Sequence, residues 1–292
     1  MIADKSPLRE MPPADTSRLS FVPCDLGSAD WDALLSDGDV IHHYACTTVP
    51  ETANNDPLGD LDGNVRATVR LLETLRKKRG TRTIFPSSGG TVYGRLRKSP
   101  VSEDHPLDPI TVYGVSKVAI EKYFGFYRNI HGLDLRVARL SNPYGIGQNP
   151  LGKQGAVTTF FDLAMRDQPI EIWGDGSVVR DYIHISDAVD GLLAVLNAPL
   201  EGWNDQPVFN IGSGAGTSLR EILTVLEERL GRKLNVRYLP GRRFDVPSSV
   251  LDIGRARATL GWAPKLAFSA GMDLMMSDYR AKQTAYSTLL PA

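Results

Sequence analysis

The order of strand-like and helix-like segments limits the possible folds of this chain more than any other feature. Runs with apolar residues every three or four positions, typical of helices, separate short apolar runs typical of strands. The strand-like runs cover residues 19–26, 39–45, 81–88 and 133–142, and the helix-like runs cover 30–37, 64–78 and 115–132. This alternation predicts parallel strands joined by crossover helices, in a doubly wound α/β sheet.

After Asn142 the alternation loosens. Residues 143–155 form a loop rich in glycine and proline, and the last third of the chain contains shorter elements of both kinds. We therefore expect a smaller, mixed α/β domain after the parallel sheet. In open parallel sheets a ligand binds beyond the carboxyl ends of the strands, so residues that follow the strand-like runs are expected to meet at one site.

Charge and cysteine content bear on the partners of the chain. The 292 residues carry a formal net charge of -1, which favours neither nucleic acid nor an anionic membrane as a partner. The basic run 76–79 closes a helix-like segment, where cations favour the helix dipole. No apolar stretch approaches the length of a membrane span, and the N-terminal residues lack an apolar signal-like run. Cys24 and Cys46 suit reduced thiols, so we expect a cytoplasmic protein.

A tyrosine and a lysine four residues apart form the first candidate for chemistry. Tyr113 and Lys117 fall on one face of a helix-like segment. A lysine charge beside a phenol stabilises the phenolate and lowers the pKa of the tyrosine. Such a tyrosine can act as a base near neutral pH. The spacing alone is common by chance, so it needs further support.

Four further segments accompany this pair in a fixed order. They are the helix-like run that begins at Asn64, residues 86–94 (PSSGGTVYG), residues 139–145 (RLSNPYG) and residues 172–192 (IWGDGSVVRDYIHISDAVDGL). Together with Tyr113 and Lys117 they resemble the extended short-chain dehydrogenase/reductase family, and most closely its UDP-galactose 4-epimerase-like members. The resemblance extends from about residue 18 to the end of the sequence.

The resemblance implies a fold and a reaction. The fold is a Rossmann-type doubly wound sheet for NAD, expected over residues 1–141 and 180–203, with a nucleotide-sugar-binding domain over residues 142–179 and 204–292. The reaction is 4-epimerisation of a nucleotide-diphosphate sugar. A tyrosine removes the proton of the sugar C4 hydroxyl, hydride passes to NAD, and hydride then returns to the other face of the 4-keto sugar.

The resemblance also implies roles for individual residues. Tyr113 resembles the catalytic acid/base, and Lys117 resembles the partner that also bonds the nicotinamide ribose. The implied cofactor contacts are Asp25 and Leu26 at the adenine, Tyr44, Ala45 and Cys46 beneath the cofactor, Asn64, Ser87 and Ser88, and Pro143. The implied substrate contacts are Asn142 beside the sugar and, for the diphosphate, Arg180 and Arg242. No metal is implied.

The chain departs from the family pattern next to the tyrosine. Gly89 stands where members usually carry Ser or Thr, so either Ser88 or Thr91 is expected to supply that hydroxyl, or the substrate meets Tyr113 directly. Dehydratases carry an acidic pair at the positions of Gly90 and Thr91. Because dehydration needs those groups as acid and base, an epimerase is favoured over a 4,6-dehydratase.

A second departure concerns the phosphate-binding loop. The family opens with a strand, a GxxGxxG turn, a helix and a second strand that ends on an acidic residue. Residues before Arg18 include no glycine, and residues 19–26 resemble the family's third strand. We therefore expect an N-terminally truncated Rossmann domain with impaired NAD binding. The glycine-rich run 212–216 predicts a strand-to-helix turn capped by Thr217 or Ser218, and not a substitute phosphate loop.

Alternatives to an active epimerase stay open from the sequence. One is a non-catalytic sugar-nucleotide-binding protein, and another is a dehydratase, reductase or decarboxylase of the same family. A homodimer is expected because Ile120, Phe124 and Tyr127 follow the helix that resembles the family's dimer helix, although the same stripe suits a core. His42 and His43 are predicted to pack against neighbouring side chains and not to bind a metal, since no other potential ligand occurs at a spacing typical of metal sites.

Overall fold

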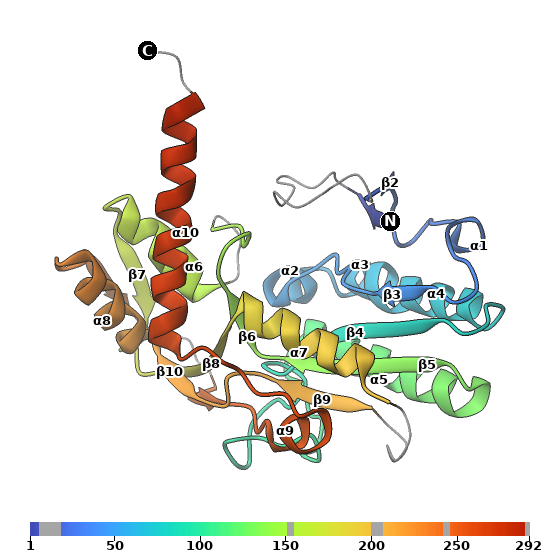
Figure 1. Ribbon diagram of the computed structural model, residues 1–292. Coiled ribbons are helices and arrows are strands. Elements are labelled where there is room, and N and C mark those ends of the chain that lie inside the picture. The colour runs from blue at the N-terminus through green and yellow to red at the C-terminus, as the bar shows by residue number, and fades with distance from the viewer. Residues whose placement is uncertain (6–18, 151–154, 200–206, 242–245, 290–292) are drawn as a thin grey trace. The chain divides into compact units, whose positions relative to one another are not determined.

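The structure is a computed structural model (Figure 1) that describes residues 1–5, 19–150, 155–199, 207–241 and 246–289. The chain forms two compact units. The first comprises residues 1–94, 107–138 and 199–208, and the second comprises residues 95–106, 139–198 and 209–292. These units group residues by their contacts, whereas the expected domain boundaries concern ligand binding and stay a prediction.

The first unit opens with two short strands, of which only the second was expected. β1 (Ile2–Asp4) pairs in parallel with β2 (Phe21–Pro23), and Asp4 lies opposite Pro23. β1 supplies a strand before the one that resembles the family's third strand, and it ends on an acidic residue. The sequence analysis did not predict this strand, because three residues are too few for a periodic pattern. No glycine occurs in the sequence before Gly27.

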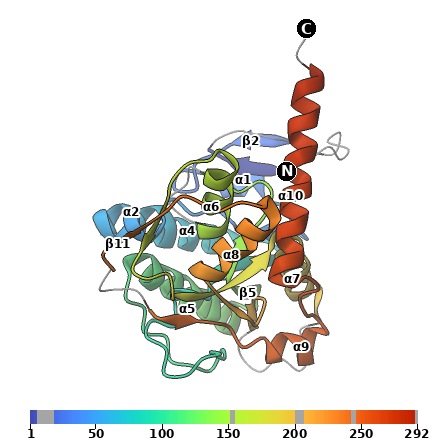
Figure 2. The same ribbon diagram turned by 90° about the vertical axis from the view of Figure 1, so that its left-hand side faces the viewer.

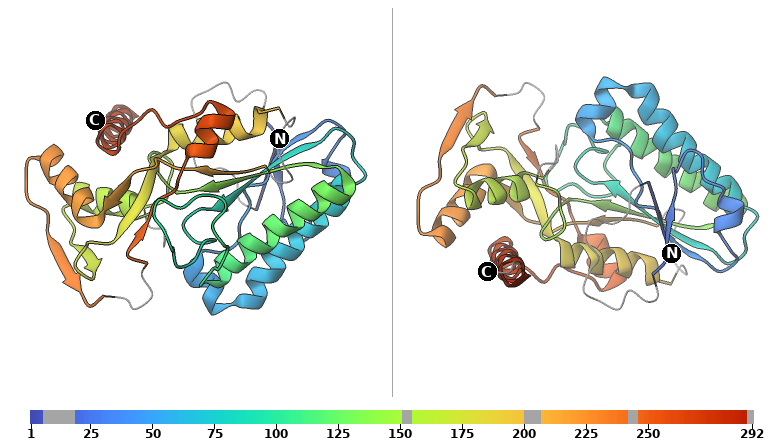
Figure 3. Two further views of the ribbon diagram at one scale, coloured as in Figure 1. Left: turned by 90° about the horizontal axis from the view of Figure 1, so that it is seen from below. Right: turned by 90° about the horizontal axis from the view of Figure 1, so that it is seen from above.

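One four-stranded sheet has the strand order β3-β4-β5-β9, and its residues 139–140 and 209–211 are counted in the second unit. Its strands are β3 (Val40–His42), β4 (Arg82–Ser88), β5 (Asp134–Leu140) and β9 (Val208–Ile211). β3 and β4 are parallel, and the Val137 amide of β5 donates to the Pro207 carbonyl beside β9 at 2.9 Å. Helices α4 (Ala67–Leu75) and α5 (Val112–His131) lie side by side (Figure 3). The predicted α/β fold with parallel strands is confirmed.

Helix α5 carries the tyrosine and lysine, and its ends are well defined. The Thr111 side chain accepts a hydrogen bond from the Gly114 amide at the N-terminus, and Gly132 ends the helix with a positive φ of 68°. Ile120, Phe124 and Tyr127 are buried in the core of this unit. These three residues therefore follow the core alternative that the sequence left open.

Short helices fill the connection from β3 to α4. They are α2 (Pro50–Asn55), α3 (Pro57–Asp60) and the π-helical turn η1 (Leu61–Arg66), and a further short helix, α1 (Trp31–Leu34), precedes β3. Asp60 ends α3, and Asn64 lies within η1. π-helical turns occur often at functional sites, because the extra residue redirects side chains.

The second unit has mixed sheets. In one sheet β8 (Val179–His184) pairs in parallel with β6 (Asn142–Tyr144) and β12 (Ser248–Ser249), and antiparallel with β10 (Gly216–Ser218). In the other sheet β7 (Ile170–Trp173) pairs in parallel with β11 (Val236–Leu239). The mixed α/β character expected for the later part of the chain is present.

Five helices complete the second unit. They are α6 (Ala156–Met165), α7 (Ile185–Asn197), α8 (Leu219–Leu230), α9 (Gly254–Leu260) and α10 (Phe268–Leu289), the last of which is the long helix in Figure 2. A core that includes Phe160, Leu226 and Met272 joins α6, α8 and α10. Among the described residues, no helix combines the length and the apolar character needed to span a bilayer.

The glycine-rich run 212–216 connects β9 to the short strand β10, and the helix α8 follows β10 with the predicted cap at Ser218. Ser218 caps α8 in a capping box with Glu221. The amides of Ser213 and Gly214 donate to the Asp181 carboxylate at 2.7 and 3.2 Å. The turn therefore binds a carboxylate of its own chain.

Candidate active site

A small recess in the first unit contains the predicted catalytic pair. We call it the Tyr113 recess, and its lining residues are Ala45, Cys46, Asp60, Asn64, Phe85, Tyr113, Ser116, Lys117 and Ile120. They come from the loop after β3, from α3 and η1, from β4, and from α5. The sequence analysis named five of them, namely Tyr113, Lys117, Ala45, Cys46 and Asn64. The recess thus joins residues that are more than 60 positions apart in the chain.

Lys117 lies against two aromatic rings and a backbone carbonyl. Its Nζ atom is 4.5 Å from the centroid of the Phe85 ring and 5.4 Å from that of the Tyr113 ring. The same atom donates to the Pro86 carbonyl at 3.2 Å. The lysine is buried, and these contacts hold its ammonium beside the tyrosine, as the spacing of the two residues predicts.

Burial opposes the charged form of both members of the pair. Burial raises the pKa of Tyr113, and the nearby Cys46 and Asp60 raise it further. Burial lowers the pKa of Lys117, whereas Cys46, Asp60 and Glu121 act in the opposite direction. The lowered tyrosine pKa expected from the sequence is therefore not found in the chain alone, because burial, Cys46 and Asp60 all raise it.

Two hydroxyl groups at the end of β4 have no partner. Ser87 Oγ and Thr91 Oγ1 are buried, and neither forms a hydrogen bond within the described part of the chain. Ser88, also predicted to belong to the site, is partly buried, and its carbonyl accepts from the amides of Thr91 and Val92. Buried hydroxyls without partners are costly unless a ligand or water binds them. They mark this strand end as a place where a polar ligand can bind.

Asn64 forms its hydrogen bonds within the chain. Its Oδ1 atom accepts from the Thr47 amide at 2.9 Å, and its Nδ2 atom donates to Thr48 Oγ1 and Asp60 Oδ1, each at 3.0 Å. The side chain is buried. Asn64 thus orders the loop after β3, and a direct cofactor contact stays a prediction.

The other predicted cofactor residues of the first unit lie outside the lining of the recess. Asp25 is exposed, pairs with Lys5 at 2.6 Å and accepts from the Gly27 amide, and these bonds lower its pKa. Leu26 is buried. Tyr44 is exposed, and its hydroxyl lies 2.8 Å from His42 Nδ1.

The predicted substrate residues belong to the second unit. Asn142 Nδ2 donates to the Asp181 carbonyl at 2.9 Å, and Pro143 pairs with Ile183 across β6 and β8. One guanidinium nitrogen of Arg180 donates to the carbonyls of Val179 and Val246 at 2.8 and 2.7 Å. Arg242 lies outside the described residues.

Sequence analysis missed Asp60, Ser116 and Asp4. Asp60 is fully buried and accepts hydrogen bonds from the hydroxyls of Thr48 and Ser116. Ser116 lies inside the Tyr113–Lys117 spacing, which could have drawn attention to it. Asp4 follows only two strand residues, too few for a periodic pattern.

Comparison with known proteins assigns the chain to a family. Residues 4–212 match the NAD dependent epimerase/dehydratase family. The UDP-glucose 4-epimerase of Mycolicibacterium smegmatis is 35% identical over 270 residues, which are 92% of this chain and 85% of that protein. The dTDP-4-dehydro-6-deoxyglucose reductase of Escherichia coli is 37% identical over 241 residues, 82% of this chain and 74% of that protein. The chain belongs to the NAD-dependent epimerase/dehydratase family of enzymes.

Solved structures agree with this assignment. The UDP-glucose 4-epimerase of Thermotoga maritima, determined with UDP-glucose, has a TM-score of 0.84 and 31% identity and covers 90% of this chain and 85% of its own. The UDP-glucose 4-epimerase of Thermus thermophilus, determined with NAD, has a TM-score of 0.80 and 28% identity. The match covers 89% of this chain and 84% of that chain. The predicted Rossmann-type fold and the predicted family are confirmed, and NAD is the cofactor of the family.

Proposed function

We propose that the chain is an NAD-dependent 4-epimerase of nucleotide sugars and that its substrate is a UDP-hexose. The observation that carries this proposal is the Tyr113 recess, which places a tyrosine and a buried ammonium near a strand end with two partnerless hydroxyls. The UDP-glucose 4-epimerases among the relatives support the substrate class. Gly90 and Thr91 offer no carboxylate for dehydration, which supports epimerisation.

The residues of the first unit fit the nicotinamide end of NAD. The free hydroxyls of Ser87 and Thr91 suit the polar groups of a ribose or carboxamide, and Lys117 suits a ribose hydroxyl. The contacts proposed for this unit are those with the nicotinamide end of the cofactor. When bound, NAD supplies a reversible hydride acceptor for the sugar C4 atom.

In this proposal Tyr113 accepts the proton of the C4 hydroxyl and later returns it. As a phenolate it takes this proton when C4 is oxidised, and as a phenol it gives the proton back when C4 is reduced from the other face. Because burial opposes the phenolate, the adjacent Lys117 ammonium is needed to stabilise it. Thr91 Oγ1 is the candidate for the hydroxyl that relays between Tyr113 and the sugar.

The second unit is proposed to hold the nucleotide and its diphosphate. Arg180 and Arg242 bind the diphosphate, and Asn142 with Pro143 positions the sugar. A guanidinium is suited to this role because its planar donors match phosphate oxygens. The nitrogen of Arg180 that donates to two carbonyls fixes the direction of its guanidinium.

A homodimer through the outer face of α5 forms part of the proposal. Val115, Tyr123, Phe126 and Ile130 follow one another along this helix and are exposed, with Phe126 at 51% and Ile130 at 65%. Leu58 and Leu61 are exposed on α3 and η1, which contact α5. An apolar surface of this kind marks a protein interface. Its residues differ from those that the sequence analysis named, which are buried.

The proposed location is the cytoplasm.

An assay of interconversion tests the proposed activity. The purified chain with NAD is incubated separately with UDP-galactose and UDP-glucose, and the products are followed by proton NMR. Both incubations are expected to reach the same mixture. Binding of a UDP-sugar without turnover would instead support a non-catalytic protein. The reductase relative makes reduction the second candidate, and consumption of a reduced nicotinamide with a dTDP-4-keto sugar would support it.

A further inference from the structure

The buried carboxylate of Asp60 is the feature of the Tyr113 recess that the proposed mechanism does not yet use. Asp60 has no exposed surface. Both oxygens of its side chain accept hydrogen bonds: Oδ1 from Thr48 Oγ1 and from Asn64 Nδ2, and Oδ2 from Ser116 Oγ. Burial of a carboxylate is costly, and such hydrogen bonds offset only part of that cost. An apolar side chain at this position would avoid the cost, so stability alone does not explain the carboxylate.

The bonds of Asp60 join the elements that line the recess. Thr48 belongs to the loop after β3, Asn64 to η1 and Ser116 to α5. Ser116 precedes Lys117 and follows Tyr113 by three residues, which places it near the tyrosine on the helix surface. A hydrogen bond from Ser116 to a fixed carboxylate therefore restrains the rotation of α5 about its axis. That rotation decides which side chains of α5 face the recess.

The charge of Asp60 also affects the ammonium of Lys117. Five titratable groups lie close enough to Lys117 to interact with its charge. They are Tyr113 and Glu121 of α5, His43 and Cys46 in the segment after β3, and Asp60. Burial favours the neutral amine, whereas the carboxylate of Asp60 favours the ammonium. His43 carries no charge near neutral pH, because burial lowers its pKa to about 3. Among these groups Asp60 is a fully buried acid that the chain holds in place.

We infer that Asp60 is a positioning residue for the Tyr113–Lys117 pair, which it orients through Ser116 and for which it supplies the negative charge that keeps Lys117 protonated. This inference rests on the proposed function, because an ammonium matters there for stabilising the Tyr113 phenolate. It adds a requirement for a fixed negative charge near Lys117, which the tyrosine and the lysine do not supply. A lysine buried without a fixed counter-charge loses its proton at a lower pH.

The test measures the titration of Lys117 directly. Protein labelled with carbon-13 at the lysine Cε atoms is titrated by NMR, and the Lys117→Arg variant assigns the signal. In Asp60→Asn, which keeps the shape but removes the charge, the midpoint of Lys117 is expected to fall by about one pH unit or more. The control Asp62→Asn changes an exposed acid two residues away and leaves the midpoint unchanged. An unchanged midpoint in folded Asp60→Asn would overturn the inference.

A second variant tests orientation and covers the case in which Asp60→Asn does not fold. Ser116→Ala removes one hydrogen bond and keeps the charge. It is expected to leave the Lys117 midpoint in place while kcat falls roughly tenfold and KM changes less than about threefold. A kcat equal to that of the unchanged chain would contradict the orienting role. If the chain has no epimerase activity at all, the NMR titration still decides the charge effect, so the two failures are distinguishable.

Discussion

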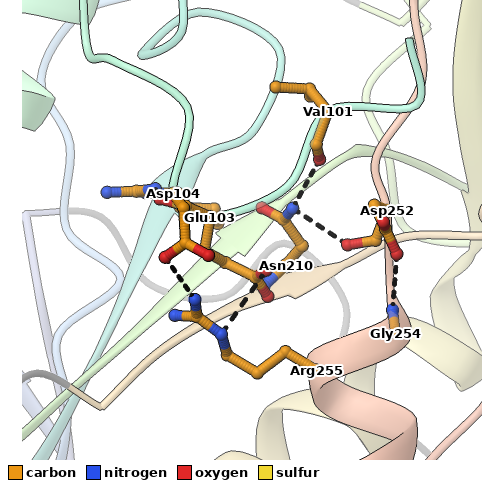
Figure 4. A network of polar contacts seen from close by, with 8 residues as sticks. Val101, Glu103, Asp104, Asn210, Asp252, Gly254 and Arg255 are labelled. Atoms are coloured by element: carbon orange, nitrogen blue, oxygen red, sulfur yellow. Dashed lines mark hydrogen bonds and ion pairs between the residues drawn. The ribbon is translucent and has the colours of Figure 1, made fainter. Parts of the chain in front are cut away.

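Two groups of buried polar side chains, one in each unit, differ in how far they are paired within the chain. In the second unit Glu103 accepts from the Asn210 amide at 2.8 Å and lies 3.6 Å from the Arg255 guanidinium (Figure 4). Asn210 Nδ2 in turn donates to the carbonyls of Val101 and Asp252 at 2.9 and 3.0 Å. In the first unit the end of β4 carries two buried hydroxyls without partners. The second network completes its bonds within the chain, whereas the first leaves donors for a ligand.

This difference separates stability from function. A network whose groups bond one another holds segments together, and loss of one member leaves its partners unsatisfied. A buried group without a partner lowers stability, and a ligand that bonds it explains why it is kept. Variants in the Glu103 network should therefore change the free energy of unfolding, and variants at the partnerless hydroxyls and in the Tyr113 recess should change turnover.

The largest effect is expected for Tyr113→Phe. Loss of the phenolic hydroxyl removes the proton acceptor, so kcat should fall on the order of 10²–10⁴-fold, with a small change in KM. The measurement is the rate of interconversion of UDP-galactose and UDP-glucose. The control is Tyr238→Phe, since Tyr238 is exposed on β11 of the second unit. Comparable rates for the two variants would remove Tyr113 from the mechanism.

The next effect concerns the network of the second unit. Glu103→Ala removes the acceptor of the buried Asn210 amide and one of the two carboxylates that pair with Arg255, so the free energy of unfolding should fall by about 2 to 3 kcal/mol. Denaturant titration measures it. The neighbour Asp104 has a side chain that is 83% exposed, and Asp104→Ala should change stability by less than about 0.5 kcal/mol. Equal losses in both variants would refute the stabilising role of the Glu103 network.

A smaller effect is expected from Thr91→Val. This change removes a buried hydroxyl that has no partner, so stability should not fall, while kcat falls roughly tenfold. The matched control is Thr68→Val. The Thr68 hydroxyl bonds the Asn64 carbonyl and His43, so this variant should lose about 1 kcal/mol of stability. Unchanged turnover in Thr91→Val would leave the relay to Ser88 or to the substrate itself.

Much of the fold could be predicted from the sequence, because parallel strands and crossover helices leave a periodic apolar pattern. The helix of residues 115–132 was placed within a few positions of α5. Tyr113 and Lys117 were found because they lie one helical turn apart. Asp60 was missed because its burial depends on Ser116, 56 residues later in the chain. The partnerless state of Ser87 and Thr91 likewise arises only from the packing around β4.

A further expected effect concerns the pH dependence of stability. The pKa of His43 is lowered to about 3 by burial, so the folded state keeps this residue neutral while the unfolded state protonates near its ordinary value of 6.5. The group's contribution is complete above pH 6.5 and is lost as the pH falls toward 3. As the pH falls through this range, the free energy of unfolding of His43→Asn should therefore decrease less steeply than that of the unchanged chain, by up to about 1.4 kcal/mol per pH unit.

Denaturant titrations at several pH values measure this slope. The control is His42→Asn, because His42 is exposed on the same strand and should change the slope less. Parallel curves for His43→Asn and the unchanged chain would show that His43 is not held neutral.

The central claim is that this chain removes and returns a hydride at C4 of the same UDP-hexose. The most direct measurement uses UDP-galactose with deuterium at C4, incubated with the chain and NAD, and mass spectrometry of the UDP-glucose formed. The account predicts UDP-glucose that keeps the deuterium, because the hydride returns to the sugar from which it came. Loss of the deuterium to solvent, or no UDP-glucose from a folded chain that binds both ligands, would contradict it.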